Sequence, residues 1–140
     1  MLEANKQAFA SQIVTSAEFV TNFPTQTASA YVAALYAKAG VTPTATETQQ
    51  AVDAFNAAGG STAGRIAAFR NVTDSASVRD AEFRGAFVLM QYFGYLRRDP
   101  DQPGYAFWLG KLNQFNGNFV TAEMVKAFIS SDEYIARFGP

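Results

Sequence analysis

The sequence predicts an all-α fold, a compact helical bundle of about six to eight helices that forms one domain over residues 1–140. Apolar residues recur at spacings of three and four along most of the chain, whereas strand-like alternation rarely extends beyond four residues. Hydrophobic residues make up 49% of the chain and charged residues 16%, a balance typical of a protein with a packed core. Because 13 Phe, six Tyr and one Trp supply much of this apolar content, we expect an aromatic core.

Helix-ending and helix-starting residues divide the first half into four expected helical segments. Pro24 ends the first segment, which comprises one or two short helices, because proline disfavours the α conformation in its predecessor. Gly40 and Gly59 stand where helices commonly terminate, and Thr44 or Thr46 is suited to capping the start of a helix. The expected ranges are 9–20, 28–39, 44–57 and 61–70, followed by a loop at 71–77.

The second half has the same helical character. Residues 81–96 are apolar nearly all round, which predicts a buried central helix whose Gly85 and Gly94 allow close helix contacts. Further helices are expected at 105–115, at 122–129 with Thr121 as the cap, and from Ser131 onward.

The two halves resemble each other in sequence. The segment 30–36 lines up with 86–92 at an offset of 56, and 67–69 lines up with 126–128 at an offset of 59. We therefore expect two degenerate repeat copies, at about 16–76 and 77–138. Because one repeat usually cannot bury its own apolar face, we expect the copies to pack together within the single domain.

Composition excludes several classes of function. The formal net charge is −1 and the basic residues are scattered, so a nucleic-acid partner is not expected. With no cysteine and no histidine, thiolate chemistry, Cys-based zinc sites and histidine general bases are absent. No apolar run is long enough for a transmembrane segment, and the first ten residues do not have the pattern of an export signal.

One stretch of the second half carries a family resemblance. It begins with an aromatic helix and reads AFVLMQYFGYLRRDPDQPGYAFWLGKLNQF, followed by AEMVKAFISSDEYIARFG. This stretch resembles the bacterial domain of unknown function DUF4214. The first half keeps the helical frame but replaces the Arg-Asp turn with AKAGVTPTATE and has no Trp. The residues that fit the family pattern are Leu96, Arg98, Asp99, Asp101, Gly104, Trp108, Ser131, Glu133 and Tyr134.

This resemblance implies a cellular context more than an activity. Domains of this family typically occur near the ends of long exported or surface-associated bacterial proteins, often beside β-rich adhesion or calcium-binding repeats. It therefore implies a secreted or cell-surface location. The helical linker domains of cyanobacterial phycobilisomes have a similar arrangement of turn and Ser-Glu-Tyr box, which is a distant analogy for an all-α scaffold.

The turn 99–104 is the first candidate site. Its Asp99 and Asp101, followed by Gly104, resemble the opening of a calcium-binding EF-hand loop, although the twelfth position is Gly110 instead of a bidentate Glu. In the alternative interpretation, Asp101 caps the next helix and Asp99 pairs with Arg97 or Arg98. No cofactor is expected, and weak calcium binding stays an open hypothesis.

Aromatic residues around the same turn are the second candidate. Tyr95, Tyr105, Phe107 and Trp108 could present a platform for a sugar or a peptide, with Arg97, Asp99 and Gln102 as polar arms, or could belong to the core. We expect the ligand contacts to come from Arg98, Tyr105 and Trp108.

No catalytic residue can be assigned from the sequence. The Ser131-Asp132-Glu133 group has the spacing of a helix start. The carboxylates that could in principle serve glycoside hydrolysis show no spacing that selects a pair: Asp53, Glu82, Asp99, Asp101 and Glu123.

The expected function is a non-catalytic interaction module that binds a protein or a cell-surface glycan through the turn from Arg98 to Trp108. A structural or self-assembly module is the alternative, and a carbohydrate-active enzyme is less favoured. The oligomeric state cannot be read from the sequence.

Overall fold

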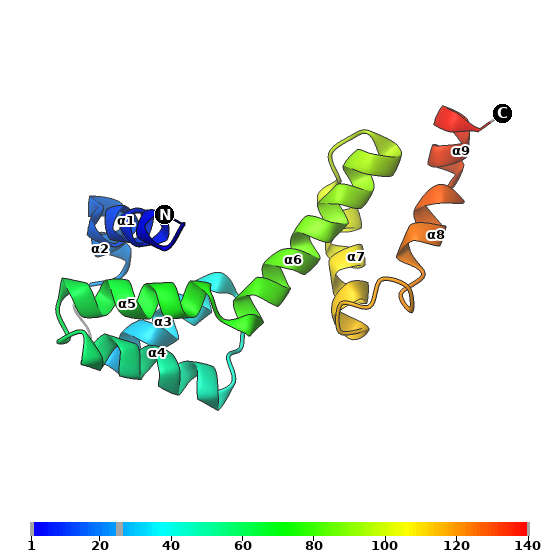
Figure 1. Ribbon diagram of the computed structural model, residues 1–140. Helices are drawn as coiled ribbons and strands as arrows, with labels where there is room; N and C mark the ends of the chain where they lie inside the picture. The colour runs from blue at the N-terminus through cyan, green and yellow to red at the C-terminus, as the bar shows by residue number, and fades with distance from the viewer. Residues whose placement is uncertain (1, 25–26, 140) are drawn as a thin grey trace. The chain divides into compact units, whose positions relative to one another are not determined.

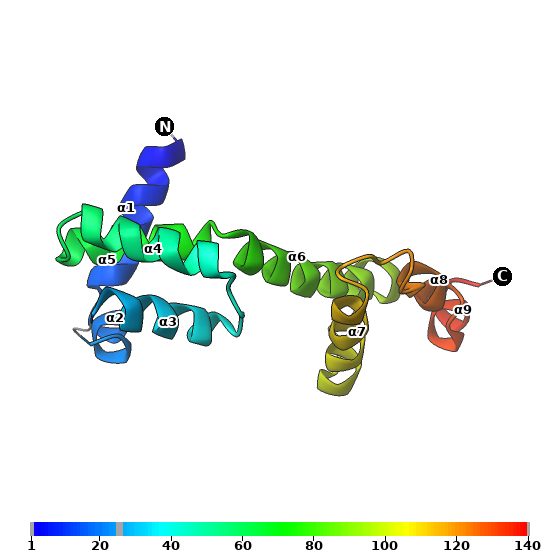
Figure 2. The ribbon, with the colours of Figure 1, turned by 90° about the horizontal axis from the view of Figure 1, so that it is seen from below.

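A computed structural model describes residues 2–24 and 27–139, and it confirms the all-α prediction, because the described residues contain helices and no strand. Figures 1 and 2 show the helices in chain order. They are α1 (Leu2–Thr15), α2 (Ala17–Asn22), α3 (Ala28–Ala39), α4 (Ala45–Ala57), α5 (Thr62–Thr73), α6 (Ala76–Gln91), the π-helical turn η1 (Tyr92–Leu96), α7 (Gln102–Gln114), α8 (Met124–Ile129) and α9 (Asp132–Phe138).

The helices belong to two units, an N-terminal unit (Met1–Arg79) and a C-terminal unit (Asp80–Pro140). Helix α6 starts in the first unit and continues in the second. The division falls close to the repeat boundary expected at 76–77. The expectation that both copies form a single domain stays a prediction.

In the N-terminal unit, α3, α4 and α5 lie side by side in both views (Figures 1 and 2). Most of the buried core side chains of this unit belong to these three helices. Helix α5 crosses α4 closely, since a Cβ at Gly64 would lie 2.5 Å from the backbone oxygen of Phe55. The start of α4 has a reciprocal capping box between Thr44 and Glu47. The buried core comprises Phe23, Tyr31, Val32, Leu35, Tyr36, Ala51, Phe55, Ala68, Val72 and Val78.

In the C-terminal unit, the core joins the last part of α6 and η1 to α7 and α8. Its most buried members include Val88, Leu112 and Met124, each at most 1% exposed. Two rings, from η1 and α7, pack against Phe128 of α8, whose centroid lies 5.0 Å from that of Tyr92 and 5.3 Å from that of Trp108. The full buried set is Val88, Tyr92, Leu96, Leu112, Ala122, Met124 and Phe128.

The two units bury residues at equivalent positions of their own helices, which agrees with the expected repeat. Buried Val32 and Tyr36 of α3 correspond at the offset of 56 to buried Val88 and Tyr92. The last turn of α4 closes with a hydrogen bond from the Gly60 N–H to the Phe55 oxygen, and α7 closes with the same pattern 57 residues later. The local fold is therefore conserved between copies although few residue identities are.

Three local expectations are wrong. The loop expected at 71–77 is short, because α5 extends to Thr73 and α6 begins at Ala76. The helix through 81–96 is not buried all round, since Phe83 is 61% and Met90 65% exposed. Thr121 does not cap α8, which begins at Met124, because the N–H groups of Glu123 and Met124 donate to the backbone oxygens of Val120 and Phe119.

The two glycines of 81–96 differ. At Gly85 a Cβ would lie 2.8 Å from the Tyr105 hydroxyl, so this glycine does allow a close contact, whereas nothing lies within 4 Å of the corresponding point at Gly94. None of the helices in the described part of the chain is long and apolar enough to cross a membrane.

Candidate functional site

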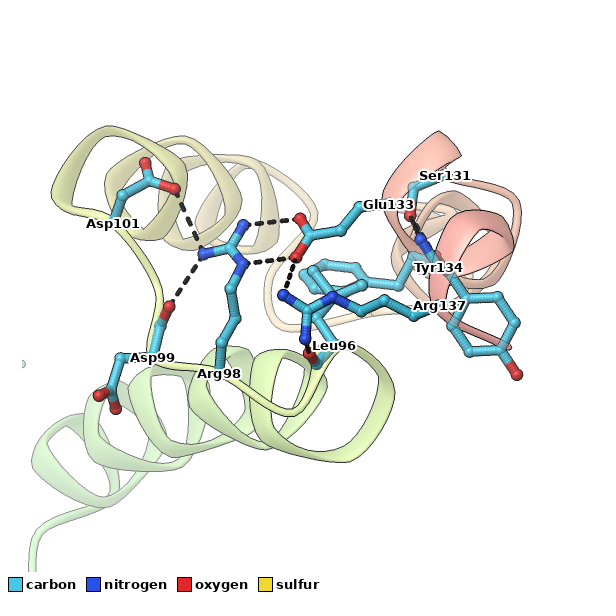
Figure 3. A network of polar contacts seen from close by, with 9 residues as sticks. Leu96, Arg98, Asp99, Asp101, Ser131, Glu133, Tyr134 and Arg137 are labelled. Carbon is cyan, nitrogen blue, oxygen red and sulfur yellow. Dashed lines mark hydrogen bonds and ion pairs between the residues drawn. The ribbon is translucent and has the colours of Figure 1, made fainter. Parts of the chain in front are cut away.

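The family-like turn is built from the end of η1 and the start of α7. Helix η1 ends at Leu96, and Arg97 reverses the chain in the left-handed conformation with φ of 50°. Asp101 then caps α7, because its Oδ1 accepts the Gly104 N–H at 2.8 Å. The capping role expected for Asp101 is thus confirmed. The turn places Arg98 beside the first turn of α9 (Figure 3).

Arg98 is held on several sides by this turn and by α9. Its Nε and Nη2 donate to the two carboxylate oxygens of Glu133 at 2.6 and 2.8 Å, a bidentate ion pair. Its Nη1 donates to the Asp99 backbone oxygen at 2.9 Å and lies 3.6 Å from Asp101 Oδ2. The guanidinium also lies over the Tyr92 ring, 5.2 Å from its centroid. Figure 3 shows Arg98 between Asp99, Asp101 and Glu133.

The charges of this network stabilise one another. The hydrogen bonds from Arg98 lower the pKa of Glu133, and donation by the Gly104 N–H lowers the pKa of Asp101. Bonding to Glu133 in turn raises the pKa of Arg98 above its usual range. Both carboxylates are therefore ionised at neutral pH, with a cation between them. Such an arrangement is suited to holding two chain segments together.

A second arginine completes the attachment of α9. Arg137 donates to the Leu96 backbone oxygen at 2.9 Å and lies 3.4 Å from Glu133. Ser131 caps α9 by accepting the Tyr134 N–H at 3.1 Å, as the sequence predicts. We call the set Arg98, Asp101, Glu133 and Arg137 the clamp.

The expected pairing of Asp99 with Arg97 or Arg98 is wrong for its side chain. Asp99 contributes only its backbone oxygen to Arg98, whose ion pairs are with Asp101 and Glu133. The physical reason is geometric. The carboxylate of Asp101 faces back over the turn because it caps α7, and Glu133 reaches Arg98 from a helix that is 35 residues away in sequence.

The aromatic side chains of the turn mostly pack inside the unit. Tyr105 and Trp108 lie against the buried core, with Trp108 on Phe128, and Tyr95 packs edge-on against Tyr134. Phe107 differs, since it is 61% exposed while its ring touches that of Trp108. The turn therefore brings Arg98, Tyr105 and Trp108 into one unit, where each has protein neighbours.

The acidic residues do not gather into a metal-ligating cluster. Among residues 2–24 and 27–139, no group of three or more His, Cys, Asp or Glu side chains lies close enough to hold a metal ion. One oxygen of Asp101 accepts the Gly104 N–H and the other faces Arg98, so this carboxylate already has protein partners. Calcium binding at Asp99 and Asp101 stays a hypothesis.

Sequence reasoning missed two features. The first is the bond between Arg98 and Glu133, for which the only signal was that both residues fit the same family pattern. The second is a mostly apolar pocket of about 620 Å³ in the N-terminal unit, which no motif indicated. Its lining includes Phe9, Ile13, Phe19, Leu35 and Phe69, with Lys38 among its few charged groups.

We expect the clamp to stabilise the C-terminal unit measurably. In a double-mutant cycle of Arg98→Ala and Glu133→Gln, urea unfolding should give a coupling free energy of about 1–2 kcal/mol, because the pair is bidentate and only one third exposed. The more exposed pair Glu123 and Lys126, whose side chains are 65% and 75% exposed, is the control, and its coupling should be close to zero. Equal coupling for the two pairs would show that the clamp is not a stabilising interaction.

The comparisons with known proteins find a family model that matches this part of the chain. Residues 73–138 match the family model described as Domain of unknown function (DUF4214). The match spans the clamp, the turn and helices α6 to α9. No curated protein and no solved structure matches the chain significantly.

Proposed function

We propose that the chain is a non-catalytic interaction module whose partner is a protein. The family model that residues 73–138 match has a description that assigns no activity, so the proposal is argued from the structure. The carrying observation is the distribution of exposed apolar side chains. Of the 13 large hydrophobic side chains exposed among the described residues, ten lie in the C-terminal unit. These ten are Phe83, Leu89, Met90, Phe93, Phe107, Phe119, Val120, Ile129, Ile135 and Phe138.

Part of this surface is continuous. The rings of Phe83 and Phe87 lie 6.1 Å apart and those of Phe87 and Phe119 lie 4.8 Å apart, so α6 and the segment before α8 share an aromatic ridge. Phe83 and Phe119 are 61% and 38% exposed. Contiguous apolar surface of this kind is typical of sites that bind another macromolecule.

The chemistry of the surface favours a protein over a glycan. A sugar site needs polar side chains that are available to hydroxyl groups, and here Arg98, Asp101 and Glu133 bond to one another. The exposed set also includes aliphatic side chains such as Met90 and Ile129, which suit an apolar protein face better than a sugar ring. Two carboxylates bound to one arginine give no support to a glycosidase.

The cellular setting is part of the proposal. The family resemblance supports a secreted or cell-surface bacterial protein, and no structural observation bears on it. Self-association is the alternative outcome of the same apolar surface. Size-exclusion chromatography with light scattering at micromolar concentration separates the two, because a stable oligomer would favour assembly and a monomer would favour a different partner.

Site-specific photo-crosslinking tests the proposed function. p-Benzoylphenylalanine is placed at Phe83, Phe119 or, as the control, at exposed Gln114 of α7 in cells that produce the protein. We expect both aromatic positions to capture the same protein, identified by mass spectrometry, and the control position not to capture it. Adducts shared by all three positions, or no protein adduct, would refute the proposal. Amide shifts confined to residues 97–108 with cell-wall or exopolysaccharide fragments would instead favour a glycan.

A further inference from the structure

A short capped helix near the start of the chain recurs at its end. Ser16-Ala17-Glu18-Phe19 begins α2 and Ser131-Asp132-Glu133-Tyr134 begins α9, at an offset of 131 − 16 = 115. In both, the serine side chain accepts the N–H three residues on, at 3.3 and 3.1 Å. Both aromatic residues also pack on a Phe one turn later, with centroid distances of 4.5 and 5.3 Å. Helices α2 and α9 thus begin as local copies of each other, and we extend the same offset to the helices before them, α1 and α8.

The first copy is covered by the helices that follow it. Val14 of α1 is 2% exposed and Phe23 after α2 is 7% exposed. Phe19 packs edge-on against Phe69 of α5 at 5.5 Å, and Phe23 packs against Tyr31 of α3 at 6.2 Å. Arg65 of α5 donates a hydrogen bond to the backbone oxygen of Phe23. The covering surface is therefore an aromatic face of α3 and α5 with one arginine.

The last copy has the same apolar residues without that cover. At the offset of 115, Ile129 corresponds to Val14 and Phe138 to Phe23. Ile129 is 43% exposed and Phe138 is 42% exposed. Val20 and its counterpart Ile135 are exposed in both copies, at 45% and 53%. The copies also differ at Phe9, which is 64% exposed, and its counterpart Met124, which is 0% exposed because it lies in the core of the C-terminal unit. Ile129 and Phe138 are the positions that α3 and α5 cover in the first copy and that stay exposed in the last one.

The middle copy shows that this pattern is not a general property of the repeat. Ser75 begins α6 in the same way, with its hydroxyl accepting the Val78 N–H at 3.4 Å, at an offset of 59 from Ser16. Its counterparts of Val14 and Phe23 are Thr73 and Glu82, which are polar and exposed. Apolar residues at these two positions therefore occur in α1–α2, which other helices cover, and again in α8–α9, but not in the middle copy.

We propose that the face of α8–α9 formed by Ile129 and Phe138 is a docking surface for another helical unit of the α3–α5 kind, presented by a neighbouring domain of the same repeat type. This inference rests on the proposed protein-binding function and names the partner for one part of the exposed surface. The partner provides rings equivalent to Tyr31 and Phe69, and an arginine that donates to the Phe138 backbone oxygen as Arg65 donates to Phe23.

The test extends the chain so that α8–α9 stands where α1–α2 stands in the first unit. Residues 1–138 are followed directly by residues 24–140, so that Phe138 precedes Pro24 as Phe23 does in the natural chain. Since the protein has no cysteine, Ile129→Cys in the first segment gives a single thiol. We expect this thiol to react with Ellman's reagent at least about ten times more slowly than Ile129→Cys in the ordinary chain, because covered thiols are protected.

Matched variants make the result decisive. Ile135→Cys in the same extended chain should react as fast as in the ordinary chain, because its counterpart Val20 stays exposed. In the ordinary chain, Val14→Cys should react much more slowly than Val20→Cys, which checks the covered first copy itself. Equal rates for Ile129→Cys in both chains, whether or not the added unit folds, would overturn the inference. The thiol rates need no cellular partner, so this inference can fail while cross-linking at Phe83 still supports the proposed function. Conversely, cross-linking can fail while the thiol rates support the docking surface.

Discussion

Replacing Phe128 with alanine should lower the free energy of unfolding of the C-terminal unit by about 3–5 kcal/mol, the usual cost of removing a buried phenyl ring. Phe128 is 3% exposed and lies between the rings of Tyr92 and Trp108, so the change leaves a cavity and removes two aromatic contacts. The neighbouring change Ile129→Ala is the control. Its side chain is 43% exposed, and its loss should cost less than about 1 kcal/mol.

Tryptophan fluorescence measures this effect in the right place. Trp108 is the only tryptophan in the chain, and it packs on Phe128, so its emission reports unfolding of the C-terminal unit. Far-UV circular dichroism reports the helices of both units. If Phe128→Ala costs no more than Ile129→Ala, the aromatic cluster is not the core of this unit.

The same experiment tests the expected single domain. One cooperative domain requires the fluorescence and dichroism transitions to coincide in urea, and to shift together in Phe128→Ala. If only the fluorescence transition moves, the N-terminal unit unfolds independently, and the two repeat copies are separate domains.

The features that could be predicted from the sequence depend on nearby residues. Ser131 and Asp101 cap helices as expected because a cap needs only the side chain and the N–H groups of the next turn. Thr121 does not act as a cap, because the N–H groups of Glu123 and Met124 donate to backbone oxygens instead. Local rules therefore locate helix ends well except where a backbone turn already binds the N–H groups that a cap would bind.

Contacts between distant segments could not be predicted in the same way. Arg98 has nearby carboxylates at Asp99 and Asp101, yet its strongest partner is Glu133. Likewise, an apolar run such as 81–96 fixes a helix but not which side is covered, and Phe83 and Met90 proved exposed. Which side of a helix is buried depends on the segments that pack against it, and the periodicity of the helix itself does not identify those segments.

A carboxylate in the N-terminal unit should govern how that unit responds to acid. Glu47 lies at the start of α4 and links it to the start of α6. Its Oε1 accepts the Ser77 N–H at 2.9 Å, and its Oε2 accepts the Ser77 hydroxyl at 2.7 Å and the Thr44 N–H at 2.8 Å. These bonds, those from Ser77 above all, lower the pKa of Glu47 from 4.5 to about 2.

The lowered pKa determines the direction of the effect. A carboxyl whose pKa is lower in the folded state stabilises it above the unfolded pKa, and this contribution is lost as the pH falls through the folded pKa. For Glu47 the window extends from about pH 4.5 down to about pH 2. At neutral pH, Glu47→Gln should cost about 2 kcal/mol, less than the full pKa difference implies, because the site is partly exposed and the amide oxygen still accepts.

The measurement compares unfolding free energies of the natural chain and Glu47→Gln between pH 7 and pH 2, with circular dichroism as the readout. Their difference should shrink as the pH falls through the window, because protonated glutamate and glutamine then bond alike. Ser77→Ala is the matched variant, since it removes the hydroxyl but keeps the backbone donor of residue 77. In this variant, a carboxyl NMR titration should show a pKa for Glu47 between about 2 and 4.5, because one of the bonds that lower it is lost. A difference that is constant with pH would mean that the link between α4 and α6 does not depend on the charge of Glu47.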